Sequence, residues 1–290
     1  MDKIIFGDNQ FFGINHMSEE KAQSQAERFK DINDIIAVID TVYECGVRAF
    51  MFNTHDRVAD ICDHFRANAH KYPDIKFYPS LPYAHKYASA VTEKGMIGAL
   101  NEFLFGRRSV GQALTTLVRG TKTIVSRDLS EVMKLLVDSE MRMFNGLNVR
   151  AVFLQNIVTD LLLGLGSKEV FIQFAKHIRE KYNADPAFNT MNMPRLVDFL
   201  IECGIENPIV CSSINKIGYL MNPDKASYEN TIRTKPFRPM AMSILASGAI
   251  SPINAVEYIS SLGKVSSIVF GASSRAHIEE TIELINAYLP

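Results

Sequence analysis

Short apolar segments alternate with stretches of helical length along most of this chain. The segment 47–52 has strand character, and Ile32–Glu44 carries apolar residues at helical spacing before it ends at Gly46. Repeated strand–helix units favour a parallel sheet that is covered by helices. About eight strands are predicted in this way, a number that favours a closed barrel over an open sheet. We therefore expect α/β architecture, a single (β/α)8 TIM barrel over residues 1–290. The predicted strands are 3–6, 47–52, 75–78, 151–154, 187–189, 209–212, 239–244 and 267–270.

One stretch breaks this rhythm, between the third and the fourth predicted strand. Residues 84–148 are predicted to form a helical insertion, with helices near 95–105, 110–118 and 130–144. A barrel needs only one helix at this place, and long insertions in compact domains often serve function. The surplus is interpreted as a lid over the site or a surface for self-association. A solvated helical decoration is the alternative.

Composition restricts the class of partner. The formal net charge is -1, which argues against nucleic acid or an acidic membrane surface as a partner. The four cysteines contain no CxxC pair, and no apolar run approaches the ~20 residues of a membrane span. The N-terminus lacks the pattern of a signal peptide. We expect a cytoplasmic protein with a small-molecule substrate, no nucleic-acid or membrane partner, and self-association into a homo-oligomer left open.

Four motifs in the second half follow one another in a familiar order. They are AFNTMN at 187–192, SINKIGY at 213–219, SILASG at 243–248 and FGASSR at 270–275. In order and spacing these resemble the fifth, sixth and seventh strands and the closing turn of the aldo-keto reductase superfamily. The segment 45–54 is more loosely similar to that family's second strand. The resemblance implies the barrel fold, an NADP cofactor, and a catalytic aspartate, tyrosine, lysine and histidine on the first four strands.

The sequence departs from the family at each of those catalytic positions. Asn53 stands at the aspartate position and Val58 at the tyrosine position, while the third strand has no lysine and the fourth has no histidine. Carbonyl reduction needs a proton donor beside the carbonyl oxygen, so another group must supply it. This indicates a divergent member of the superfamily. The catalytic candidates, all at or after strand ends, are Asn53, His55, Tyr83, His85, Lys86 and Asn156.

The turn at 271–275 is the strongest local signal for an anion. A glycine allows close approach of a ligand, serines can cap the next helix, and the N-terminus of that helix attracts negative charge. In the resembled family this region contacts the phosphates of the cofactor; a plain serine cap without a ligand is the alternative. The predicted cofactor-binding residues are Asn189, Asn215, Ser243, Gly271, Ser273, Ser274 and Arg275.

The predicted strand ends are rich in asparagine and glutamine, which exchange hydrogen bonds without titrating. This favours a polar carbonyl or sugar-like substrate, although loop tips are often rich in asparagine for conformational reasons. No metal site is predicted, because His55 and Asp56 would need a third ligand that no spacing supplies. The main hypothesis is an aldo-keto-reductase-like enzyme, NADP-linked or with no cofactor. The alternatives are a non-redox lyase or isomerase of a phosphorylated substrate and an inactive binding protein.

Overall fold

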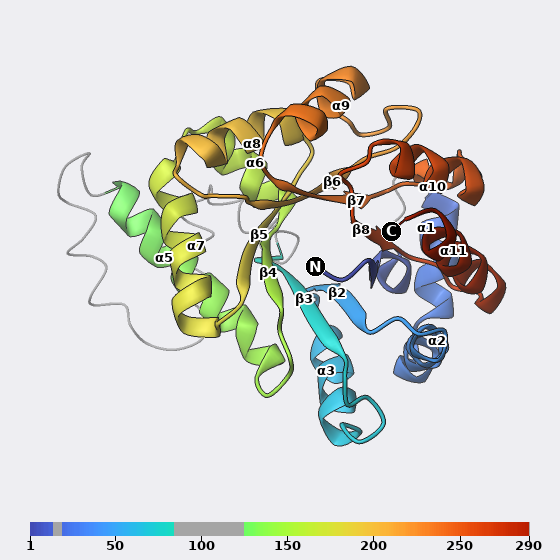
Figure 1. Ribbon diagram of the computed structural model, residues 1–290. Coiled ribbons are helices and arrows are strands. Elements are labelled where there is room, and N and C mark those ends of the chain that lie inside the picture. Colours follow the sequence, from blue (N-terminus) through green and yellow to red (C-terminus); the bar gives the residue numbers. More distant parts are fainter. Residues whose placement is uncertain (14–18, 84–124, 290) are drawn as a thin grey trace.

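Eight parallel strands close into a barrel at the centre of the molecule, with helices around it (Figure 1). The computed structural model describes residues 1–13, 19–83 and 125–289. Each strand pairs with the next, and the ring closes where the last strand pairs with the first, for example Phe6 with Phe270. The predicted TIM barrel is confirmed. The strands are β1 (Ile4–Phe6), β2 (Ala49–Asn53), β3 (Lys76–Leu81), β4 (Ala151–Leu154), β5 (Asp185–Thr190), β6 (Ile209–Ser213), β7 (Arg238–Met242) and β8 (Ser267–Phe270).

The side chains of each strand alternate between two apolar cores, as the pleat requires. On β2, Phe50 and Phe52 face the layer between the strands and the helices, while Met51 faces the barrel interior. Large residues such as Tyr78 and Phe153 fill that interior and are almost fully buried. The interior of the barrel is therefore filled by side chains at the level of these residues, and the space for a ligand lies nearer the carboxyl ends of the strands.

Some of the helices begin at a residue whose side chain caps them. Asp31 caps α2 through the backbone N–H of Asn33, and Asn192 caps α8, which has a proline in its first turn. The helices on the barrel are α2 (Ile32–Glu44), α3 (Val58–Ala67), α5 (Val125–Met141), α6 (Asn156–Gly164), α7 (Lys168–Tyr182), α8 (Met193–Glu202), α9 (Lys225–Thr234), α10 (Pro252–Ser261) and α11 (Arg275–Tyr288). The remaining elements are α1 (Glu19–Arg28) and the 3-10 helices η1 (Asn9–Phe12), η4 (Arg142–Phe144) and η5 (Ala246–Gly248).

Two motifs lie one step further along the chain than their resemblance predicts. The segments 213–219 and 243–248 mostly follow β6 and β7 instead of forming them. They therefore sit at the carboxyl ends of the strands, where barrels bind ligands. Three helices, α1, α6 and α9, were not predicted. The sequence of α9 is polar apart from a few buried side chains, so it lacks a strong periodic signal.

The connection from β3 to β4 contains an ordinary barrel helix. α5 packs beside α7 and contacts β3, so it occupies the place of the single helix that a barrel needs here (Figure 1). The helices predicted near 95–105 and 110–118 lie outside the described residues, as do His85 and Lys86. In the described part of the chain, no helix is long and apolar enough to cross a membrane.

Candidate active site

A cavity of about 400 Å³ opens at the carboxyl ends of the strands. This volume lies in the range of small-molecule sites. Its described walls are mainly amide, hydroxyl and apolar, and they contain no lysine, arginine or histidine side chain. The polar side chains that line it are Asp8, Asn9, Gln10, Gln25, Asn53, Ser80, Tyr83, Gln155, Asn156, Asn189, Ser243 and Ser247.

The wall of this cavity contains a carboxyl group, that of Asp8 after β1. It is hydrogen-bonded to Asn53, whose side chain is in turn hydrogen-bonded to Gln155. Asp8 accepts hydrogen bonds from both the backbone N–H (2.6 Å) and the side-chain Nδ2 (2.9 Å) of Asn53. The oxygen of the Asn53 side chain accepts from Nε2 of Gln155 at 3.2 Å. Asp8 is only 3% exposed. Burial raises the pKa of its carboxyl to about 7, against the opposing effect of the Asn53 hydrogen bonds.

The other titratable groups of the mouth follow β2 and β3. The ring of His55 stacks on Phe12 at 4.3 Å between centroids and lies 5.9 Å from the ring of Tyr83. Tyr83 lines the cavity, and burial is the main cause that raises its pKa above the usual value. A buried carboxylate from α5, Glu140, accepts hydrogen bonds from the Thr54 hydroxyl and the Tyr83 backbone N–H. This contact joins the ends of β2 and β3.

The end of β5 presents a buried amide to the cavity. Nδ2 of Asn189 donates to Oγ of Ser80 at 3.0 Å, but Oδ1 of Asn189 is buried and has no protein partner. On the neighbouring β6, the hydroxyl of Ser213 is also buried without a partner. Buried polar atoms are normally paired, so two such atoms on adjacent strands indicate that a ligand or water completes them.

The loop after β5 is fixed by hydrogen bonds to side chains of α6 and α9. Asp160 on α6 accepts hydrogen bonds from the Thr190 hydroxyl and from the Met191 backbone N–H, and Tyr228 donates to the Met191 carbonyl. Because Asn189 directly precedes Thr190, these contacts fix the direction in which its amide points.

The loops after β6 and β7 differ in what they offer. Asn215 uses both ends of its amide on the backbone of Tyr219, so it shapes its own loop. After β7, Ser243, Ala246 and Ser247 have φ values of 54°, 46° and 56°. Ser243, Ser247 and Gly248 line the cavity. Left-handed residues of this kind can turn successive backbone N–H groups toward one side, an arrangement that suits anions.

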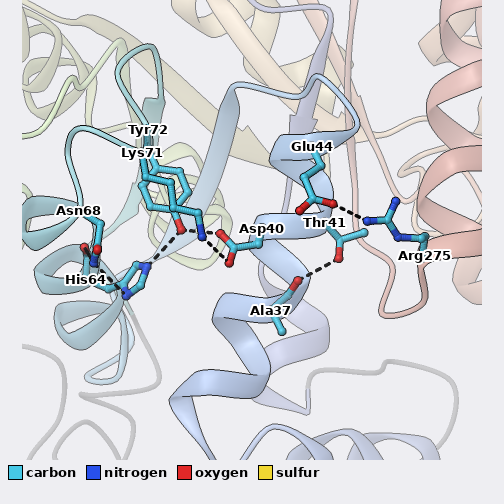
Figure 2. Close-up of polar contacts among 9 residues, drawn as sticks. All are labelled: Ala37, Asp40, Thr41, Glu44, His64, Asn68, Lys71, Tyr72 and Arg275. Atoms are coloured by element: carbon cyan, nitrogen blue, oxygen red, sulfur yellow. Dashed lines mark hydrogen bonds and ion pairs between the residues drawn. The ribbon is translucent and has the colours of Figure 1, made fainter.

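In the closing turn, Gly271 leaves room for a side chain. A Cβ atom at this position would lie 2.2 Å from Oε1 of Gln10, so the absent side chain accommodates Gln10. Ser274 caps α11 through the backbone N–H of His277, as predicted. Arg275 pairs with Glu44 of α2 (Figure 2), and it also pairs with Glu279 of its own helix. The carbonyl of Ser273 accepts from Arg28 at 2.6 Å, which brings a second arginine to this turn.

Some of the predicted site residues line one cavity in the structure, and the others do not. Asn53, Tyr83, Asn156, Asn189, Ser243 and Gly271 all line one cavity. His55 contacts the wall residue Tyr83, whereas Asn215, Ser273, Ser274 and Arg275 are absent from its walls. No group of three or more metal-ligating side chains occurs in the described ranges. Sequence reasoning missed Asp8; its position directly after the first strand was the available signal.

The comparison with solved structures finds barrels of one kind over nearly the whole chain. PA4992 of Pseudomonas aeruginosa, provisionally assigned as an aldo-keto reductase, superposes with a TM-score of 0.58 at 12% identity, covering 99% of this chain and 91% of its own. The thermostable aldo-keto reductase Tm1743, solved with the inhibitor epalrestat, gives 0.56 at 9% identity, with 100% and 92% covered.

The fold is that of the aldo-keto reductases. A variant of Gox0644 solved with NADPH also matches, with a TM-score of 0.50, 9% identity, and coverage of 90% and 82%. No protein-family model matches the sequence, and neither does any curated protein. The resemblance from the motifs is thus confirmed at the level of the fold, while the roles of individual site residues stay predictions.

Proposed function

We propose that this chain is an NADP(H)-dependent reductase of a small, neutral, polar carbonyl compound. The observation that carries the proposal is the buried, unpaired Oδ1 of Asn189, a residue that lines the cavity. An oxygen in that position calls for a hydrogen-bond donor from a ligand or a water. The carboxamide of nicotinamide has such a donor, and the NADPH complex of a protein with this fold supports the same choice.

The residues of the cavity fit the two ends of such a cofactor. Asn189, with Ser213 beside it, would hold the carboxamide. The backbone after β7 and the N-terminus of α11 would face the phosphates. When bound, the cofactor supplies the hydride; the protein orients both reactants and excludes water around them.

Arg28 is better placed than Arg275 to receive the 2′-phosphate, the group that distinguishes NADPH from NADH. Arg275 is already neutralised by two carboxylates. Among the described contacts Arg28 has no ion pair, and its guanidinium meets the carbonyl of Ser273. A guanidinium without an acidic partner can form a charge-assisted pair with a phosphate.

The walls of the cavity favour a neutral substrate. A carboxylate or phosphate on the substrate would require compensating positive charge, and no described wall residue carries one. Amides and hydroxyls such as Asn53, Gln155 and Ser80 instead match the hydroxyl and carbonyl groups of a sugar-like molecule. This argues against a phosphorylated substrate.

Titration of the protein with NADPH tests the proposal. The chain has no tryptophan, so the fluorescence of the cofactor itself or calorimetry is the suitable signal. Asn189→Leu should weaken NADPH binding about tenfold or more, the loss of roughly one buried hydrogen bond. Arg28→Ala should weaken NADPH more than NADH, while Arg275→Ala, the matched control, should change neither by more than a few fold. Absence of NADPH binding at millimolar concentration would refute the proposal.

A further inference from the structure

The acidic side chain of the cavity is not where the resembled family has its aspartate. That position is Asn53 on β2, and the carboxyl group instead comes from Asp8, directly after β1. Asn53 aims two N–H donors at it, one at each carboxyl oxygen. Among the described wall residues Asp8 alone has an acidic side chain.

We propose that Asp8 is the proton donor to the carbonyl oxygen of the substrate, and that Asn53 is its positioning residue. This inference rests on the proposed reductase function and adds the group that completes the chemistry. In this proposal the catalytic carboxyl, Asp8, follows the first strand instead of standing on the second. The amide of Asn53, at the family's aspartate position, orients it.

The surroundings of Asp8 suit a proton donor that works near neutral pH. Burial raises its pKa to about 7, where an acid is both present and strong enough to transfer its proton. Among the described residues, the other titratable groups near this end of the cavity include Tyr83, His55, Asp56 and Glu140. Burial is the main cause that raises the pKa of Tyr83 above the ordinary tyrosine value. Its phenol is therefore a weaker acid than the Asp8 carboxyl.

The step balances in both directions. In reduction, the carbonyl carbon takes a hydride from the reduced nicotinamide and the π pair moves to the oxygen. That oxygen takes the proton of Asp8, which leaves an alcohol, the oxidised cofactor and the Asp8 carboxylate. In oxidation the carboxylate takes the hydroxyl proton back. Reduction therefore needs Asp8 protonated, and oxidation needs it ionised.

The experiment measures turnover of small neutral probes with NADPH and of the corresponding alcohols with NADP. DL-glyceraldehyde, methylglyoxal and a short panel of ketones serve as the carbonyl probes. Reduction should fall as the pH rises through about 7, and oxidation should rise over the same range. Asp8→Asn should lower kcat by about 100-fold or more in both directions, with the Kd for NADPH within a few fold of the wild type.

Asn53→Ala should change the pH dependence of reduction, which would stay the same if Asn53 had only a structural role. It removes the side-chain donor, which favours the carboxylate, and keeps the backbone donor. The pKa of Asp8 should rise, so the falling limb of reduction should move to higher pH. Asp185→Asn is the matched control, because Asp185 begins β5 at the opposite end of the barrel and pairs with Arg238.

Each outcome decides between the two proposals. If the wild type reduces a probe and Asp8→Asn keeps its rate within about threefold, or if Asn53→Ala leaves the pH limb in place, Asp8 is not the proton donor and the reductase function stands. If the wild type binds NADPH but reduces none of the probes, both proposals are overturned. Loss of turnover with retained NADPH binding and a shifted limb supports both.

Discussion

Replacing Gly271 by alanine should destabilise the barrel through one identifiable collision. The new Cβ would lie 2.2 Å from Oε1 and 3.0 Å from Cδ of Gln10. Gln10 is 6% exposed, and its Nε2 donates to the carbonyl of Gly7 at 2.8 Å. It must therefore move by roughly 1 Å to restore an ordinary contact, and it then loses this hydrogen bond.

The magnitude follows from those two effects. Overpacking a buried site costs about 1–3 kcal/mol, and a lost hydrogen bond costs about 1 kcal/mol. The two partly overlap, because the same side-chain movement relieves one and causes the other. We expect Gly271→Ala to lower the free energy of unfolding by about 2 kcal/mol. The backbone itself adds no penalty, since Gly271 does not need a positive φ.

A double-mutant cycle in urea isolates the collision. Gln10→Ala removes the side chain, so Gly271→Ala in that background should cost less than about 0.5 kcal/mol. Gly164→Ala is the matched control: it lies in α6 with nothing within 4 Å of a new Cβ, and it should be neutral or slightly stabilising. Equal costs for Gly271→Ala in both backgrounds would show that Gln10 is not the obstacle and refute this reasoning.

Three further predictions concern stability. The pKa of Asp8 in the folded protein, about 7, lies above its ordinary value of 3.8, so ionisation of this carboxyl opposes folding. As the pH rises from below 3.8 to above 7, the free energy of unfolding of the wild type should fall by up to about 4 kcal/mol relative to Asp8→Asn. Parallel stability curves for the two proteins would contradict this. Glu140→Gln weakens the buried link to Thr54 and Tyr83 and should cost about 1–3 kcal/mol by chemical denaturation, whereas exposed Glu131→Gln should cost almost nothing. Phe153→Ala opens a cavity inside the barrel and should cost about 3–5 kcal/mol, so an unchanged Tm would show that the interior is not packed as described.

The barrel could be predicted from the sequence because its signals are local and repeat. Apolar runs such as 267–270 coincide with the observed strands, and the segment around Gly46 ends a helix as predicted. β5 is longer than predicted, since it begins with Asp185 and Pro186, which are unfavourable in strands. α9 was missed because its apolar residues are few.

The site was only partly predictable, for a different reason. Asn53, Asn189 and Ser243 line one cavity because the strand ends of a barrel converge, so their positions followed from the fold. Burial raises the pKa of Asp8, and the hydrogen bonds from Asn53, 45 residues away in the chain, oppose that rise. No local pattern reveals such an environment. The pairing of Arg275 with Glu279 has helical spacing and was readable, but the approach of Glu44 was not.

A crystal structure of the protein with NADPH is the most direct test of the central claim, that the mouth of this barrel holds a nicotinamide cofactor. We expect the carboxamide within hydrogen-bond distance of Oδ1 of Asn189 and the reactive face of the ring toward Asp8 and Tyr83. A cofactor bound elsewhere on the molecule, or a nicotinamide ring directed away from Asn189, would contradict it.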